Sequence, residues 1–139
     1  MHMRDAHMGL SPTTQRREGY PFGECVRAAY ATLLDLPIEA VPRFDPAALA
    51  PGEEQIDRER RWLASIGYEL HEVAVPPEEK LPQDVIDQTP PDVEHLMSGW
   101  SPRGLCHRVV GRGGRLLWDP HPSREGLVTI FSLGFLVPR

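Results

Sequence analysis

Residues 23–34 read GECVRAAYATLL and decide the fold of this chain. Apolar side chains recur here and just beyond at intervals of three or four residues: Val26, Ala29, Tyr30, Leu33 and Leu36. This spacing predicts an amphipathic helix over residues 24–36 with one stripe facing a core. Pro37 follows and ends the helix, because proline lacks the backbone N–H that the next turn needs.

Cys25 occupies the first turn of this predicted helix. The unsatisfied backbone N–H groups and the positive end of the helix dipole favour a thiolate at that position. A thiolate is a strong nucleophile, so Cys25 is a candidate catalytic residue. The alternative is that Cys25 is only a small buried apolar side chain, as many helical cysteines are.

Downstream of this helix, the pattern predicts a second helix over residues 53–66 and a strand over residues 68–75. The proline-rich segment 76–91 is expected to be a loop with at most a helical turn at 83–87. Four further strands are expected at residues 93–97, 105–111, 115–118 and 127–136. Two helices followed by a meandering sheet predict an α+β fold, with the N-terminal helix central and packed on an antiparallel sheet. His71 and His95 are expected on strand surfaces.

Composition predicts a single domain. The chain has 139 residues, 40% of them hydrophobic and 25% charged, which fits one globular domain over residues 11–139 after a flexible N-terminus at 1–10. The net charge of −5 argues against nucleic acid or an anionic membrane as a partner. No apolar run approaches the roughly 18 residues of a membrane span, and no secretory signal is recognisable. A cytoplasmic location is therefore expected, and the oligomeric state is left open.

Gly113 and Gly114 mark a hairpin between the third and fourth expected strands. A loop of these two residues alone would put His107 and Asp119 on opposite faces of the sheet. A three-residue loop that also includes Arg112 would set His107 directly opposite Asp119, within reach of a carboxylate–imidazole hydrogen bond. We predict the three-residue loop.

These residues together predict a Cys-His-Asp site for acyl transfer. Cys25 would attack an amide, ester or thioester carbonyl, His107 would hold and return the proton, and Asp119 would orient the imidazole. The Cys25 backbone N–H and the side chain of Gln15 are the expected oxyanion donors. This chemistry needs no cofactor, and the expected partner is a short peptide or small-molecule acyl substrate.

Loops beside the catalytic strands supply the candidate substrate-binding residues, which are Trp100, Arg103, His121, Ser123 and Arg124. A competing function is a catalytically inactive binding module that holds a small anionic ligand or a partner peptide through Arg103, Ser123 and Arg124.

A zinc site is a second competing chemistry, since Cys25, Cys106, His107, Asp119 and His121 are all possible ligands. No Cys-X-X-Cys or paired-histidine spacing supports zinc, so no metal is predicted. Cys106 is expected to point into the core, on the opposite face of its strand from His107.

A glutamine upstream of Gly-X-Cys, and a distant His-X-Val-Val with Asp-Pro twelve residues after the histidine, resemble the papain-like cysteine peptidase superfamily. The layout is most similar to the peptidases that cleave double-glycine leader peptides. The segments Ser-Pro-Arg-Gly at 101–104 and Asp-Pro-His-Pro-Ser-Arg at 119–124 also resemble a set of small uncharacterised bacterial and phage proteins. The superfamily resemblance implies a papain-like fold and catalytic roles for Cys25, His107 and Asp119.

Overall fold

The structure, a computed structural model, describes residues 24–75 and 80–139. The elements in chain order are α1 (Cys25–Leu34), the 3₁₀ turns η1 (Ile38–Ala40) and η2 (Pro46–Ala48), α2 (Gln55–Ser65), β1 (Tyr68–Ala74), α3 (Pro82–Gln88), β2 (Glu94–Trp100), β3 (Cys106–Arg112), β4 (Arg115–Trp118) and β5 (Thr129–Pro138). Within these described ranges, no helix is both long enough and apolar enough to cross a membrane.

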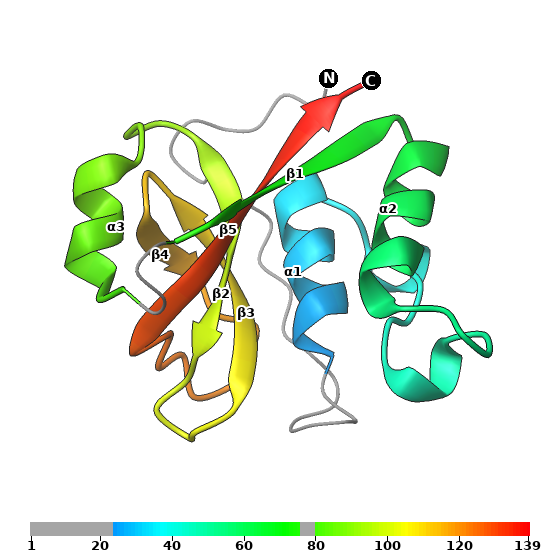
Figure 1. The fold of residues 1–139 in the computed structure, drawn as a ribbon, viewed down its shortest axis with the longest axis horizontal. Helices are drawn as coiled ribbons and strands as arrows, with labels where there is room; N and C mark the ends of the chain where they lie inside the picture. Colours follow the sequence, from blue (N-terminus) through cyan, green and yellow to red (C-terminus); the bar gives the residue numbers. More distant parts are fainter. Residues whose placement is uncertain (1–23, 76–79) are drawn as a thin grey trace.

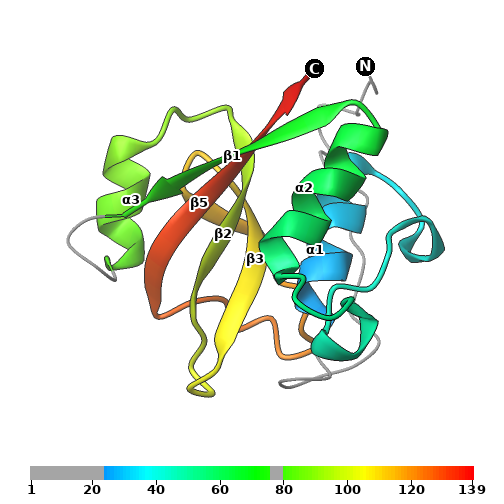
Figure 2. The same cartoon turned by 45° about the vertical axis from the view of Figure 1, so that its right-hand side comes forward.

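The five strands form one antiparallel sheet in the order β1-β5-β2-β3-β4. The helices α1 and α2 lie side by side against one face, and α3 lies on the other side of the sheet (Figures 1 and 2). Each face has its own apolar core: Leu96 and Val110 pack with α1 and α2, whereas Met97 and Val109 pack with Val85 of α3. The predicted α+β class, with an antiparallel sheet, is confirmed.

The first helix is buried over most of its length, between the sheet and α2. All residues from Ala28 to Leu33 are buried, so the helix is enclosed more completely than a single apolar stripe predicts. It ends at Leu34, because Asp35 adopts a left-handed conformation with φ of 55° and closes the last turn. The two-residue difference from the predicted end follows from this cap, which precedes Pro37.

Two elements are longer than predicted. The segment expected to hold at most one helical turn contains α3 (Pro82–Gln88), which begins with Pro82 at a position where a missing N–H costs nothing. Strand β2 continues to Trp100, three residues beyond its predicted end. Gly99 permits this extension, since a Cβ there would lie only 1.9 Å from the backbone oxygen of Thr129 in β5.

The prediction of a three-residue β3–β4 loop is wrong. Arg112 pairs with Arg115, so the turn consists of Gly113 and Gly114 alone. Their φ values of 60° and 80° are both left-handed, which is the geometry of the tight hairpin turn that two consecutive glycines favour. Taken alone, this register would place Asp119 on the face opposite to His107.

A β-bulge in β4 reverses that consequence. Gly111 pairs with Leu116 but Val110 pairs with Trp118, so Leu117 is an extra residue on β4. One extra residue flips every later side chain to the other face of the sheet. Continued by one residue, this register sets Asp119 opposite Val109, on the same face as His107. Asp119 therefore contacts the histidine along a diagonal, and not from the position directly opposite.

His95 is not on a strand surface, as predicted, but is fully buried. Its Nδ1 lies 3.1 Å from the carbonyl oxygen of Leu96, and its Nε2 accepts a hydrogen bond of 3.0 Å from the backbone N–H of Gly114. Burial lowers the pKa of His95 despite the contact with Leu96, so the imidazole is neutral and suited to accept this bond. His95 thus holds the β3–β4 turn in place from the neighbouring strand.

Candidate active site

Cys25 is the first residue of α1 and is partly buried. The first turn of a helix carries backbone N–H groups with no partner inside the helix, so the sulfur lies in a locally positive environment. Glu24, just before it, is buried, and its carboxylate lies 3.5 Å from the guanidinium of Arg27 one turn along the helix.

His107 and Asp119 are in direct contact. The Nε2 of His107 lies 2.6 Å from Oδ1 of Asp119, and both side chains are almost fully buried. The same carboxylate accepts hydrogen bonds from the backbone N–H groups of His121, at 2.8 Å, and Gly126, at 2.7 Å. Because a carboxylate only accepts, Nε2 carries a proton and Nδ1 is left to face the thiol.

The thiol of Cys25 meets β3 where that strand runs past the end of β4. Strand β4 pairs with β3 only from Val110 onward, which leaves the start of β3 accessible to α1. Cys25, His107 and Arg108 line the same cavity, and the His107 side chain and the backbone N–H of Arg108 both help to lower the pKa of the thiol. The structure thus brings Cys25, His107 and Asp119 together in the order that the sequence predicts.

The pKa values of the three groups are coupled. Burial by itself raises the pKa of Cys25, but hydrogen bonding to His107 and its positive charge, aided by Arg108, hold this pKa below its ordinary value. Burial lowers the pKa of His107, yet the hydrogen bonds and charges of Asp119 and Cys25 raise it to about 9. Burial raises the pKa of Asp119, but donors from His107, His121 and Gly126 bring it below its usual range. These directions favour a thiolate–imidazolium pair at pH values between the pKa of Cys25 and the pKa of His107.

This coupling predicts the titration of His107. We expect the imidazole to keep its proton until about pH 9, whereas an ordinary histidine loses its proton near pH 6.5. The measurement is the pH dependence of the His107 ring signals in NMR spectra, with Cys25→Ser and Asp119→Asn as variants. Each variant removes a group that favours the imidazolium, so each midpoint should fall, and an unshifted midpoint near 6.5 in the wild type would contradict the coupling.

A cavity of about 210 Å³ opens beside the thiol. It is lined by Cys25 and His107, by apolar side chains that include Phe44 and Leu105, and by four arginines of the described chain: Arg27, Arg43, Arg103 and Arg108. Acidic side chains in the wall are Glu24 and Asp45. This volume suits a small acyl group or a short peptide segment.

The structure brings two of the five predicted substrate-binding residues to this cavity, Arg103 and His121. The Nη1 of Arg103 donates to the hydroxyl of Ser123, at 2.9 Å, so Ser123 supports the wall without being part of it. Trp100 does not line the cavity: it ends β2 and packs edge-on against Phe131, with ring centroids 6.2 Å apart.

Arg124, predicted to bind substrate, is not in the cavity wall either. Its guanidinium stacks over the ring of Trp118 at 4.1 Å and donates hydrogen bonds to the carbonyl oxygens of Asp119, at 3.0 Å, and His121, at 2.6 Å. These bonds close the loop that follows β4. Arg124 therefore helps to hold the carboxylate of Asp119 in place.

Cys106 is exposed and lines the cavity, so its predicted place in the core is wrong. Strand alternation does separate it from His107, but β3 begins at Cys106, and this first residue is exposed in the cavity wall instead of covered by the core. In the part of the chain that the structure describes, no three or more His, Cys, Asp or Glu side chains are grouped as metal ligands.

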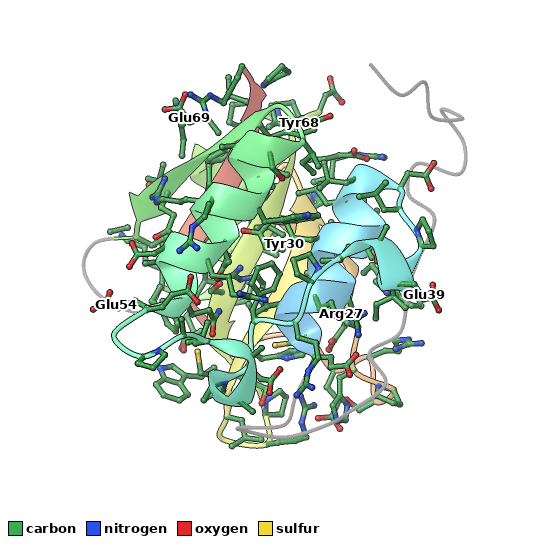
Figure 3. The ribbon with its side chains drawn as sticks, turned by 90° about the vertical axis from the view of Figure 1, so that its right-hand side faces the viewer. Arg27, Tyr30, Glu39, Glu54, Tyr68 and Glu69 are labelled. Carbon is green, nitrogen blue, oxygen red and sulfur yellow. The ribbon has the colours of Figure 1, made fainter. Side chains whose placement is uncertain are left out.

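Sequence reasoning missed a buried polar network behind the thiol. Glu59 of α2 accepts hydrogen bonds from the hydroxyl of Tyr30, at 2.5 Å, from Gln55, at 2.8 Å, and from Arg108, at 2.6 Å. Figure 3 shows Tyr30 between α1 and α2, where the network joins the two helices. The available signal was Arg108 itself. Strand alternation places it on the face that α1 and α2 cover, where an arginine needs a buried partner.

The predicted oxyanion donor Gln15 lies outside the described residues. The other predicted donor, the backbone N–H of Cys25, belongs to the first residue of α1, whose N–H has no acceptor within the helix.

Comparisons with known proteins found no matching family model, no matching curated protein and no matching solved structure.

Proposed function

We propose that this protein is a cysteine-dependent hydrolase or acyl transferase that acts on an amide, ester or thioester carbonyl. The observation that carries the proposal is the buried 2.6 Å contact between His107 and Asp119, beside a thiol at a helix start whose pKa is lowered. A nucleophile, a base within hydrogen-bond reach and a group that orients the base form the arrangement needed for covalent acyl transfer.

The reaction divides into two steps. The Cys25 thiolate attacks the carbonyl carbon, the charge moves to the carbonyl oxygen beside the helix start, and His107 protonates the leaving group as the acyl–sulfur bond is completed. Water or another acceptor then gives its proton to His107 and attacks the thioester, which releases the acyl group and restores the thiol pair. Asp119 holds the imidazole orientation throughout and stabilises its positive charge.

A papain-like scaffold accounts for this layout. The nucleophile begins a helix that packs on the antiparallel sheet, the histidine lies on β3, and the aspartate directly follows β4. The cavity of about 210 Å³ favours a short peptide or a small acyl compound as substrate. The mechanism needs a reduced thiol, which suits the cytoplasm.

Alkylation tests the nucleophile directly, because Cys106 provides a second thiol in the same cavity for comparison. We expect iodoacetamide at pH 7 to label Cys25 at least about tenfold faster than Cys106, since each unit of difference in thiol pKa changes the thiolate population about tenfold. Burial and the charge of Cys25 raise the pKa of Cys106, which widens the difference. Peptide mapping by mass spectrometry gives both rates in one sample.

His107→Ala should slow the labelling of Cys25 and leave that of Cys106 nearly unchanged. Cys106→Ser should keep one fast site. Turnover of acyl thioesters and electrophilic peptides should disappear in Cys25→Ala. Equally slow labelling of both cysteines would instead favour a non-catalytic module that uses the arginine-lined cavity to hold an anionic ligand.

A further inference from the structure

Arg108 lines the cavity that contains the thiol, and buried partners hold its side chain. Its side chain is only 15% exposed, yet it lines the cavity. Its backbone N–H and its charge both help to lower the pKa of the Cys25 thiol, which lines the same cavity. Any acyl group attached to Cys25 therefore shares this cavity with Arg108.

Three elements fix the orientation of the guanidinium. Its Nε donates to the hydroxyl of Ser98 in β2 at 3.2 Å, and its Nη1 donates to Glu59 in α2 at 2.6 Å. The carbon at its centre lies 5.8 Å from the ring centroid of Tyr30 in α1. A guanidinium held on three sides binds its remaining partner with little further loss of side-chain entropy.

The third nitrogen of this group differs from the other two. Nη2 of Arg108 makes no hydrogen bond to any residue that the structure describes. It is also not one of the fully buried side-chain atoms of the described residues that lack a partner. Arg108, which lines the cavity, thus has two N–H donors on Nη2 that no described residue engages.

The other three arginines of the wall are engaged differently. Arg27 donates to the carbonyl oxygen of Val41 at 2.7 Å, and Arg103 lies 3.7 Å from Glu125. Arg43 forms two hydrogen bonds with the carboxylate of Asp45, at 2.8 and 2.6 Å. Each of these three arginines also lies within 4 Å of a carboxylate outside the reacting pair, namely Glu24, Asp45 or Glu125, whereas Arg108 is paired with Glu59 of α2.

We propose that the cavity selects acyl substrates that carry a carboxylate within a few bonds of the reacting carbonyl, and that Nη2 of Arg108 binds this carboxylate. Guanidinium and carboxylate form short, strong, charge-assisted hydrogen bonds, and the burial of Arg108 strengthens them. This inference rests on the proposed function, because it names the substrate class of the same site.

Iodoacetate and iodoacetamide test this selection without knowledge of the natural substrate. Both react when the Cys25 thiolate attacks the methylene carbon, so that a carbon–sulfur bond forms and iodide leaves with the electron pair. They differ in carrying a carboxylate or a neutral amide. The ratio of their rate constants at Cys25 therefore reports carboxylate binding, and a change in thiolate population cancels from it. The 3-iodopropionate and 3-iodopropionamide pair tests a carboxylate one carbon further from the sulfur.

Arg108→Lys is the informative variant, because lysine keeps the charge beside Glu59 but loses the planar fork that presents Nη2 to the cavity. We expect it to lower the iodoacetate-to-iodoacetamide ratio about tenfold relative to the wild type. Arg115→Gln, an exposed arginine on β4 outside the cavity wall, is the matched control and should leave the ratio unchanged. If Arg108→Lys does not fold, the double variant that combines Glu59→Gln with Arg108→Gln is used instead. It removes both charges together and should also lower the iodoacetate-to-iodoacetamide ratio.

The two proposals fail in distinguishable ways. In the first case, iodoacetamide labels Cys25 fast, but no Arg108 variant changes the rate ratio of either reagent pair. This result overturns the carboxylate selection and leaves the proposed nucleophile intact. Labelling of Cys25 no faster than that of Cys106, with either reagent, overturns the proposed function and with it the substrate class.

Discussion

Deletion of Leu117 is expected to separate His107 from Asp119 and to slow the alkylation of Cys25 about tenfold, by roughly one unit of pKa change. Leu117 is the extra residue of the β4 bulge. Without it, the two-residue turn dictates the register, and Asp119 projects from the face opposite to His107. The pKa of His107 should then fall from about 9 toward its ordinary value of 6.5, because the carboxylate no longer stabilises the imidazolium.

Leu117→Ala is the matched control for this deletion. It removes most of a side chain that packs against the core beside α1 but keeps the residue count, so the bulge and the position of Asp119 should persist. Near-ultraviolet circular dichroism checks that both variants are folded, and NMR gives the His107 midpoint. A deletion variant with wild-type labelling and a midpoint near 9 would show that the bulge does not determine the face of Asp119.

Glu59→Ala is expected to have the largest effect on stability, a loss of about 3–5 kcal/mol in the free energy of unfolding. The variant leaves the buried guanidinium of Arg108 without its carboxylate and deprives Tyr30 and Gln55 of their acceptor. Burial raises the pKa of Glu59, but the charge of Arg108 and the hydrogen bonds from Tyr30 and Gln55 lower it overall, so an ionised carboxylate is lost. Urea denaturation at pH 7 measures the change.

The double variant Glu59→Leu with Arg108→Met separates a lost ion pair from lost packing. An apolar pair of similar volume removes both charges at once, so most of the stability should return. Its Cys25 should still be alkylated by iodoacetamide, but with a reduced preference for iodoacetate. If the double variant has as low a free energy of unfolding as Glu59→Ala, the loss of stability comes from packing and not from an unpaired charge.

Most secondary structure could be predicted because it depends on local pattern. Apolar spacing located α1 and α2, and β4 was predicted with its observed ends, Arg115–Trp118. The prediction of α3 was too short, since its prolines suggested a loop, whereas Pro82 occupies the first helical position and tertiary burial of Val85 stabilises the rest. The burial of His95 depends on the position of Gly114 on the next hairpin, a contact that local pattern does not contain.

The catalytic candidates were accessible to sequence reasoning, but the contact between two of them was predicted for the wrong reason. A glycine pair indicates a turn, and parity then decides which side chains share a face. The predicted loop was one residue too long, which would have put the two side chains on opposite faces in the real turn. The unpredicted bulge adds one residue to β4 and returns Asp119 to the face of His107, so the two residues meet even though the predicted register does not occur. Bulges are difficult to foresee because they relieve strain between strands and leave little trace in composition.

Local pattern was enough to identify the amphipathic helix that carries Cys25, the thiol in its first turn, and the candidate residues His107, on a later strand, and Asp119, just after the next one. Helix periodicity and turn chemistry act over a few residues, so they can be read along the chain. Only the tertiary structure decided that Leu117 bulges, that Asp119 contacts His107, and that Arg108 is held by Glu59 beside the sulfur. Those outcomes depend on which distant groups satisfy one another when they leave water, and burial imposes that requirement only after the elements have packed.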